Sequence, residues 1–308
     1  MQVVIKPSVL GGKLSLPTSK SMGHRIMICR YLATGEISTE GLTPSKDIYA
    51  TARALEGLSS GVCNCGESGS TLRFLMPIAL ARGGKYTFTG EGRLMQRPMD
   101  TYKDIFTRMG ISWSSRGDKI TVDGKLKSGR YTLVDPLSSQ YVTGLLLALP
   151  LLDGDSVITL SQKLESSSYV DITQSVQNKF GVFSIKTLSG YEVRGNQQYK
   201  NSHAVAEPDA SQAAFWLVAN KLGSNIEAEL PENTVQGDGV ILKLLKNNIT
   251  DIDITDCPDL APVLAVWLSQ TGGVLRNCKR LRYKESDRFN AICQMLQSLG
   301  GEAILIFL

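Results

Sequence analysis

Apolar helical runs recur along the chain, and each opens on a short polar segment. Five such segments begin near Ser19 (SKSMGHRIMICRYL), Ser68 (SGSTLRFLMPIAL), Ser138 (SSQYVTGLLLALPLL), Asp209 (DASQAAFWLVA) and Asp259 (DLAPVLAVWLSQ). Serine and aspartate are preferred at helix N-caps because their oxygens accept hydrogen bonds from the free N–H groups of the first turn. The pattern therefore predicts five helices, each capped at its start by one of these polar residues.

A second, amphipathic helix is predicted after each of these runs. The apolar positions at helical spacing are Ile48, Ala52 and Leu55; Tyr102, Ile105, Phe106 and Met109; Ile172, Val176 and Phe180; Val240, Ile241, Leu244 and Leu245; and Phe289, Ile292, Cys293 and Leu296. Gly110, Gly181 and Gly300 follow three of them, as is typical of helix C-termini.

Short β-branched and alternating segments lie between the helices. They are residues 86–89, 120–122, 156–160, 183–185 and 252–254. The repeating unit is thus strand, helix, strand, helix and further strand, and the chain carries five copies.

Composition narrows the class of protein without naming its ligand. The chain has 308 residues, enough for two domains, and a formal net charge of +4, too small to indicate nucleic acid by itself. Six cysteines and two histidines, without a second C-x-C pair, predict neither a disulfide framework nor a zinc site. No secretory leader or membrane-spanning run is recognisable, so we expect a monomeric cytoplasmic protein.

The polar segments are candidate anion sites, because a helix N-terminus presents free N–H donors and the positive end of the helix dipole. Basic residues accompany several of them, including Lys20, Arg25, Arg73, Arg97 and Arg288. Two plainer interpretations stay open, in which each serine is only a cap and each arginine is a solvated surface group.

The fifth unit ends abruptly in residues 302–308 (EAILIFL), which resemble the first half of a strand or hairpin. A single apolar strand leaves its backbone groups unpaired. We therefore expect the natural chain to continue into a sixth unit. The alternative is a short native C-terminus that pairs with an earlier strand.

Several motifs, in order along nearly the whole chain, resemble those of the enolpyruvyl transferases that act on shikimate 3-phosphate. They are LPTSKSMGHR at 16–25, ESGSTLR at 67–73, QRPM at 96–99, SSQ at 138–140, SSSYVD at 166–171, EPDAS at 207–211, PDLAP at 258–262 and RYKESDR at 282–288. The resemblance implies an α/β (α+β) fold of two lobes built from repeated βαβαββ units, five of the expected six being present. Residues 14–200 would form a complete three-unit lobe, and residues 1–13 and 201–308 the incomplete second lobe.

The resemblance also implies roles for individual residues and no metal or organic cofactor. Shikimate 3-phosphate would be held by Lys20, Ser21, Arg25, Ser138, Ser139, Gln140, Ser166, Asp259 and Lys284. Phosphoenolpyruvate would be held by Lys20, Gly69, Arg97, Gln140 and Arg288. Asp259 would take the proton of the attacking hydroxyl, while Glu285 and Lys20 would handle the proton at the methylene carbon. Considered alone, Glu285 could equally pair with Arg288 on a helix surface.

The sequence departs from the family pattern at a few positions. Ser167 and Ser168 stand where Lys-Pro is common, and Arg280 stands where some members have Asn. The D-H-R segment and the later lysine of a sixth unit are missing. We therefore expect these 308 residues to bind shikimate 3-phosphate weakly and to turn over very slowly or not at all.

Two other functions are weighed against this one. A transferase acting on UDP-N-acetylglucosamine shares the fold, but typically has Lys-Asn where this chain has Ser19, Lys20 and Ser21. A non-catalytic fragment that only binds shikimate 3-phosphate is the alternative from another class.

Overall fold

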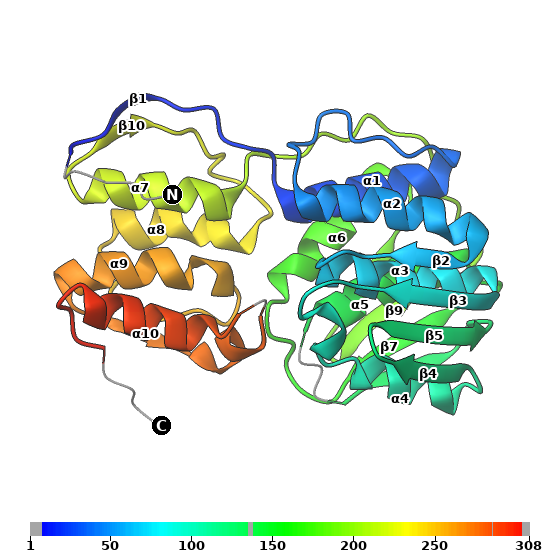
Figure 1. Cartoon of the computed structure of the whole chain (residues 1–308). Helices are drawn as coiled ribbons and strands as arrows, with labels where there is room; N and C mark the ends of the chain where they lie inside the picture. The colour runs from blue at the N-terminus through cyan, green and yellow to red at the C-terminus, as the bar shows by residue number, and fades with distance from the viewer. Residues whose placement is uncertain (1–7, 135–137, 285, 304–308) are drawn as a thin grey trace. The chain divides into compact units, whose positions relative to one another are not determined.

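The computed structural model describes residues 8–134, 138–284 and 286–303. The chain divides into two compact units (Figure 1). The first is Thr18–Glu207, and the second combines Met1–Pro17 with Pro208–Leu308. We refer to them as the central unit and the terminal unit.

The central unit contains two copies of one six-element block. The first copy is β2 (Val62–Asn64), α3 (Gly69–Arg82), β3 (Gly84–Thr89), α4 (Asp100–Arg108), β4 (Ser112–Arg116) and β5 (Lys119–Gly124). The second is β6 (Arg130–Leu133), α5 (Gln140–Ala148), β7 (Ser156–Leu160), α6 (Ser168–Lys179), β8 (Ser184–Thr187) and β9 (Gly190–Val193). Their sheets have the equivalent orders β2-β3-β5-β4 and β6-β7-β9-β8. In each sheet the first two strands are parallel and the later pairs antiparallel, so the βαβαββ repeat predicted from the sequence is present twice.

The central unit begins with a shorter block made of α1 (Lys20–Thr34) and α2 (Lys46–Ser60). Within the described stretch 18–64, β2 follows α2 almost directly, and no hairpin separates them. Two 3-10 turns, η1 (Leu94–Gln96) and η2 (Leu149–Leu151), complete the unit.

The terminal unit consists of helices and two-stranded parallel sheets. Its helices are α7 (Ala210–Lys221), α8 (Ile241–Lys246), α9 (Ala261–Thr271) and α10 (Arg288–Ser298). Its strands pair as β1 (Gly11–Lys13) with β10 (Asn225–Glu227), and as β11 (Asp251–Asp253) with β12 (Val274–Arg276). The 3-10 turns η3 (Gly237–Val240), η4 (Pro258–Leu260) and η5 (Cys278–Tyr283) connect these elements.

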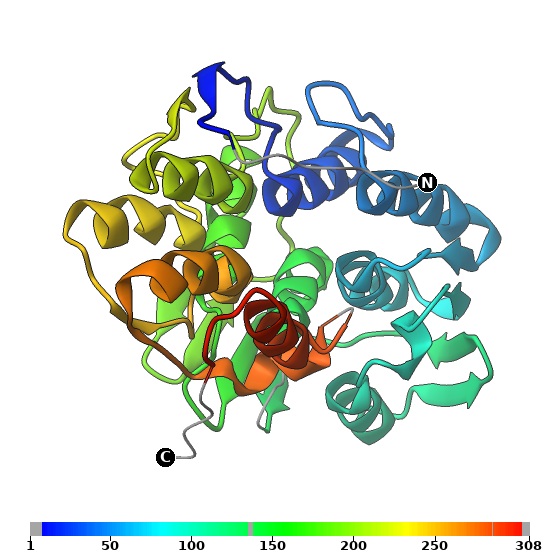
Figure 2. The same ribbon diagram turned by 60° about the vertical axis from the view of Figure 1, so that its left-hand side comes forward.

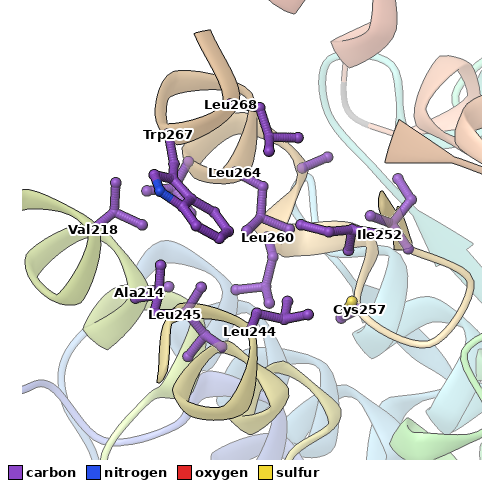
Figure 3. Packing of buried hydrophobic residues seen from close by; sticks show 14 of the residues in the cluster. Ala214, Val218, Leu244, Leu245, Ile252, Cys257, Leu260, Leu264, Trp267 and Leu268 are labelled. Carbon is purple, nitrogen blue, oxygen red and sulfur yellow. The ribbon is translucent and has the colours of Figure 1, made fainter. Parts of the chain in front are cut away.

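Each unit buries its own apolar residues. In the central unit α3 and α5 are buried along most of their length. They approach so closely that a Cβ on Gly144 would collide with the carbonyl oxygen of Arg73 and the hydroxyl of Tyr102. In the terminal unit α7, α8 and α9 pack around Trp267, which is 1% exposed (Figure 3). The helix α10 lies alongside α9 (Figure 2).

The capping prediction is confirmed at three of the five helix starts. Ser19, Ser68 and Asp209 accept hydrogen bonds from the backbone N–H groups of Met22, Thr71 and Gln212. The prediction is wrong at the other two. The helix α5 begins after Ser139, which makes no side-chain cap hydrogen bond. Asp259 lies inside η4, just before α9, and its carboxylate binds side chains from later in the chain.

The predicted strands and helix ends otherwise agree well with the structure. Residues 86–89, 120–122 and 156–160 lie within β3, β5 and β7. The prediction at 183–185 begins one residue before β8 and ends two residues short of it, and the prediction at 252–254 is displaced by one residue from β11. Gly110, Gly181 and Gly300 all have positive φ just beyond a helix, as the C-terminal pattern predicts. No described helix is long and apolar enough to cross a membrane.

Candidate active site

The candidate residues fall into two groups, one in each unit. The central unit contains Lys20, Ser21, Arg25, Gly69, Arg97, Ser138, Ser139, Gln140 and Ser166, and the terminal unit contains Asp259, Lys284 and Arg288. Glu285 lies outside the described residues.

Arg25 is a buried cation held entirely by neutral oxygens. It is 2% exposed, and its Nε donates to Thr173 Oγ1 at 2.7 Å. The two terminal nitrogens donate to the carbonyls of Ser21 (2.7 Å) and Tyr169 (2.8 Å) and to Thr143 Oγ1 (3.3 Å). Burial lowers the pKa of Arg25 to about 10, so the guanidinium remains charged at neutral pH. A buried positive charge whose described hydrogen bonds reach no carboxylate is an attractive environment for an anion.

Gly69, the first residue of α3, lies against two guanidinium groups. A Cβ placed on Gly69 would lie 2.8 Å from NH1 of Arg73 and would collide with the guanidinium of Arg97. Arg73 donates from NH1 to Gln140 Oε1 (2.9 Å) and from NH2 to the carbonyl of Pro98 (3.0 Å). The second and third polar segments and the QRPM segment therefore meet at Arg73. Arg73 accompanies the second polar segment as a basic residue, but the family resemblance implied no substrate contact for it.

Lys20 forms an ion pair with Asp47, with 2.7 Å between Nζ and Oδ2. Burial alone would raise the pKa of Asp47, but the charge and hydrogen bond of Lys20, together with the charge of Arg97, hold that pKa below its ordinary value. Sequence reasoning missed Asp47, because it stands in the first turn of α2, where acidic residues are common in any helix.

Serine residues occupy the third polar segment and its neighbourhood. Ser139 is 4% exposed, and Ser138 Oγ accepts a hydrogen bond from the backbone N–H of Gln140 at 3.3 Å. Ser166 is 3% exposed and has a φ of 56°, a left-handed conformation that is uncommon for a residue with a side chain. Such strained positions concentrate at functional sites, and the role of Ser166 stays a prediction.

The group in the terminal unit converges on one carboxylate. Oδ1 of Asp259 accepts from NH1 of Arg288 at 2.7 Å and from Nζ of Lys284 at 3.3 Å. The three side chains are 22–28% exposed, so solvent reaches all of them. The structure therefore brings together three residues that the sequence separates by up to 29 positions.

A second carboxylate of the terminal unit, Asp238, was not predicted from the sequence. It is 4% exposed and accepts a short hydrogen bond from the hydroxyl of Ser211. Burial, reinforced by the negative charges of Asp259 and Asp209, raises the pKa of Asp238 to about 7. No periodicity marks the Gln-Gly-Asp segment that contains it, so only the folded arrangement reveals this acid.

Within the described ranges, no group of three or more His, Cys, Asp or Glu side chains is placed to hold a metal ion. The arrangement instead offers cations and hydroxyl groups at helix starts, together with carboxylates that can accept protons. Cations and hydroxyl groups at helix starts are suited to bind phosphate or carboxylate groups.

Comparison with known proteins identifies the family. The family model for EPSP synthase (3-phosphoshikimate 1-carboxyvinyltransferase) matches residues 58–246 and 219–305. This chain belongs to the EPSP synthase family. The resemblance and fold class predicted from the sequence are thereby confirmed.

Named relatives and solved structures support the same family. A Clostridium kluyveri protein named 3-phosphoshikimate 1-carboxyvinyltransferase is 40% identical to this chain. The alignment is 348 positions long and covers 98% of this chain and 82% of that protein. A Clostridium perfringens protein of the same name is 38% identical in an alignment of 350 positions, which covers the same shares of the two chains. An EPSP synthase structure from Acinetobacter baumannii shares the fold, with a TM-score of 0.73 and 20% identity over 94% of this chain and 78% of that one.

Proposed function

We propose that this chain transfers the enolpyruvyl group of phosphoenolpyruvate to the 5-hydroxyl of shikimate 3-phosphate and releases phosphate, a step in the synthesis of chorismate and the aromatic amino acids. Membership of the EPSP synthase family supports this activity. The single structural observation that carries it is Arg25, a buried cation surrounded by neutral acceptors in a unit rich in hydroxyl groups.

The residues are assigned to the substrates as the family resemblance implies. Shikimate 3-phosphate contacts the side chains of Lys20, Ser21, Arg25, Ser138, Ser139, Gln140, Ser166, Asp259 and Lys284. Phosphoenolpyruvate contacts Lys20, Gly69, Arg97, Gln140 and Arg288. The close packing of Gly69, Arg73, Arg97 and Gln140 supports the second assignment, because it gathers two guanidinium groups at one helix start.

The reaction proceeds by addition and then elimination. The 5-hydroxyl oxygen bonds to C2 of phosphoenolpyruvate while C3 gains a proton, which gives a tetrahedral adduct. The C2–O bond to phosphate then breaks and C3 loses a proton, so the double bond is restored and phosphate leaves.

Three side chains move the protons in this scheme. Asp259 accepts the proton of the 5-hydroxyl, and its two cationic partners, Lys284 and Arg288, fix one of its oxygens. Glu285 and Lys20 give and take the proton at C3. The monomeric state and the cytoplasmic location remain predictions from the sequence.

Phosphorus NMR tests the activity. The protein is incubated at a concentration near that of both substrates, so that even slow turnover is visible. We expect the shikimate 3-phosphate and phosphoenolpyruvate signals to fall together while phosphate and a new monoester signal rise. With UDP-N-acetylglucosamine as acceptor, no phosphate should be released.

Two lysine variants complete this test. Lys20→Met should abolish phosphate release without changing the circular dichroism spectrum, whereas Lys46→Met, at an exposed lysine beside Asp47, should retain it. Release with the UDP-sugar but not with shikimate 3-phosphate would refute the proposed activity. Full activity of Lys20→Met would remove Lys20 from the site.

A further inference from the structure

Four buried polar side chains form a continuous hydrogen-bonded chain across three helices of the central unit. His24 Nδ1 on α1 lies 2.7 Å from Thr51 Oγ1 on α2, which in turn lies 2.7 Å from Thr71 Oγ1 on α3. Thr71 Oγ1 donates to Ser68 Oγ at 2.8 Å. All four residues are at most 3% exposed, so water does not compete for these groups. We call this chain the His24 relay.

Counting hydrogens fixes the direction of the His24 relay. A threonine hydroxyl has one proton, and the proton of Thr71 is directed at Ser68. The proton between the two threonines must then come from Thr51. The Thr51 hydroxyl also donates toward the carbonyl oxygen of Asp47 at 3.2 Å, so its one proton is shared between two acceptors other than the ring. Thr51 can therefore only accept from the ring, and Nδ1 of His24 carries a hydrogen.

The same conclusion follows from the other ring nitrogen. His24 Nε2 is buried and has no hydrogen-bond partner among the described residues. In the reverse direction Nε2 would carry a hydrogen, and a buried N–H without a partner is rarer than an unpaired acceptor. Burial, together with the positive charges of Lys20 and Arg25, lowers the pKa of His24 to about 3 despite the opposing charge of Asp47. The ring is therefore neutral at physiological pH.

The His24 relay ends at the residue that begins the phosphoenolpyruvate segment. Ser68 caps α3 by accepting from the backbone N–H of Thr71 at 3.2 Å, and Gly69 follows it directly. There is no room for a side chain on Gly69, because a Cβ there would collide with the guanidinium groups of Arg73 and Arg97. A small displacement of the first turn of α3 therefore changes the spacing between Gly69 and the two guanidinium groups.

We propose that His24, Thr51 and Thr71 are positioning residues. Starting from the protonated Nδ1 of His24, each donates a hydrogen bond to the next member of the His24 relay, and these hydrogen bonds hold the first turn of α3 in the position that binds phosphoenolpyruvate. The effect on substrate rests on the proposed function, whereas the tautomer and the direction of the relay do not.

The tautomer is tested without substrate. The chain has only two histidines, His24 and the exposed His203, so a protein labelled with nitrogen-15 histidine gives two assignable ring patterns in a long-range proton–nitrogen correlation spectrum. We expect His24 to show a protonated Nδ1 and a bare Nε2 from pH 8 to pH 4.5. An Nε2-protonated or charged His24 at pH 7 would overturn the relay.

The positioning effect is tested with an isosteric pair at one position. Thr71→Val removes the hydroxyl and Thr71→Ser keeps it. Thr71→Val should raise the KM for phosphoenolpyruvate about five- to tenfold, the amount expected for one lost buried hydrogen bond. It should leave the Kd of shikimate 3-phosphate within about twofold, and Thr71→Ser should restore the KM to within about twofold of wild type.

Two further measurements separate this proposal from general destabilisation and from failure of the proposed function. Thr87→Val removes a hydroxyl from another threonine pair of the central unit, 3.0 Å apart, and should leave both substrate constants unchanged. Thr71→Val should also accelerate hydrogen exchange at the amide of residue 71, whether or not the protein turns over. Unchanged exchange, or a KM shifted equally for both substrates, would contradict positioning by the relay. An inactive wild type with the expected tautomer and exchange would refute the proposed function alone.

Discussion

The central and terminal units hold their candidate residues in different ways. In the central unit Arg25 is buried, and four of its five N–H groups bind neutral oxygens, so its charge is fixed in place and not neutralised. In the terminal unit Lys284 and Arg288 share one carboxylate, that of Asp259, and all three are partly exposed. The first arrangement is preorganised to receive an anion, whereas in the second a carboxylate already binds the two cations, which must exchange partners when an anion binds.

The helices that carry these residues show the same contrast. Most of α3 is buried, whereas none of the described residues of α10 is buried. Buried contacts raise the free energy needed to open a segment locally. The start of α3 is therefore expected to be rigid, and the start of α10, where Arg288 lies, to be the more easily rearranged.

The largest effect is expected when Arg25 of the central unit is replaced and the change is compared with replacement of Arg288 in the terminal unit. Calorimetry measures the affinity of each variant for shikimate 3-phosphate. Arg25→Met should weaken binding about a hundredfold, or about 3 kcal/mol, because a preorganised, desolvated charge is lost. Arg288→Met, assigned to the other substrate, should change it less than about threefold. Equal losses in the two variants would remove the distinction between the units.

The next effect concerns the buried acid of the terminal unit. With the pKa of Asp238 raised to about 7, the native state binds a proton that the unfolded state has released, so stability falls as pH rises from about 4 to 7. Asp238→Asn should therefore stabilise the protein progressively, by roughly 3 kcal/mol more at pH 8 than at pH 4. Urea unfolding at both pH values measures the difference, with Asp118→Asn, at an exposed aspartate, as the control. A stabilisation independent of pH would show that Asp238 is ionised throughout.

The central unit should respond to pH in the opposite direction. Because the pKa of His24 is lowered to about 3, the unfolded state gains a proton below pH 6.5 that the native state does not bind. Stability should fall by roughly 2–3 kcal/mol between pH 6.5 and pH 4.5. His24→Asn should lose this part of the pH dependence, and His203→Asn should keep it. Identical slopes for the two variants would contradict a buried neutral His24.

The smallest of these effects tests the rigid start of α3. Gly69→Ala places a methyl group against Arg73 and Arg97, and Arg73 cannot retreat without breaking its hydrogen bonds to Gln140 and Pro98. We expect the KM for phosphoenolpyruvate to rise roughly tenfold, as for a moderately overpacked site. The Kd of shikimate 3-phosphate should change less than about twofold. A KM unchanged by the methyl group would mean that this helix start is adaptable.

Local sequence patterns predicted much of the fold, because the features concerned are local. Ser19, Ser68 and Asp209 cap helices through contacts three residues away, and β3, β5 and β7 follow alternating segments. Motifs that resemble the family indicated most candidate residues. What the sequence could not show depends on packing between distant segments.

Three residues illustrate that limit. Asp259 has the signature of a helix cap, yet it binds cations 25 and 29 residues further along the chain. Asp47 forms an ion pair with Lys20, which lies 27 residues away in the sequence. Asp238 accepts a hydrogen bond from the hydroxyl of Ser211 across the same separation. No periodicity encodes such contacts, because they arise only when the helices of a unit are packed together.

The preorganised anion site of the central unit is tested most directly by titrating the wild-type protein with shikimate 3-phosphate, in the absence of phosphoenolpyruvate, and with shikimate as the matched ligand. We expect one molecule of shikimate 3-phosphate to bind per chain. Shikimate should bind about a hundredfold more weakly, because it lacks the phosphate that the buried hydroxyls and cations receive. Equal affinities for the two ligands, or no binding of shikimate 3-phosphate, would contradict the account.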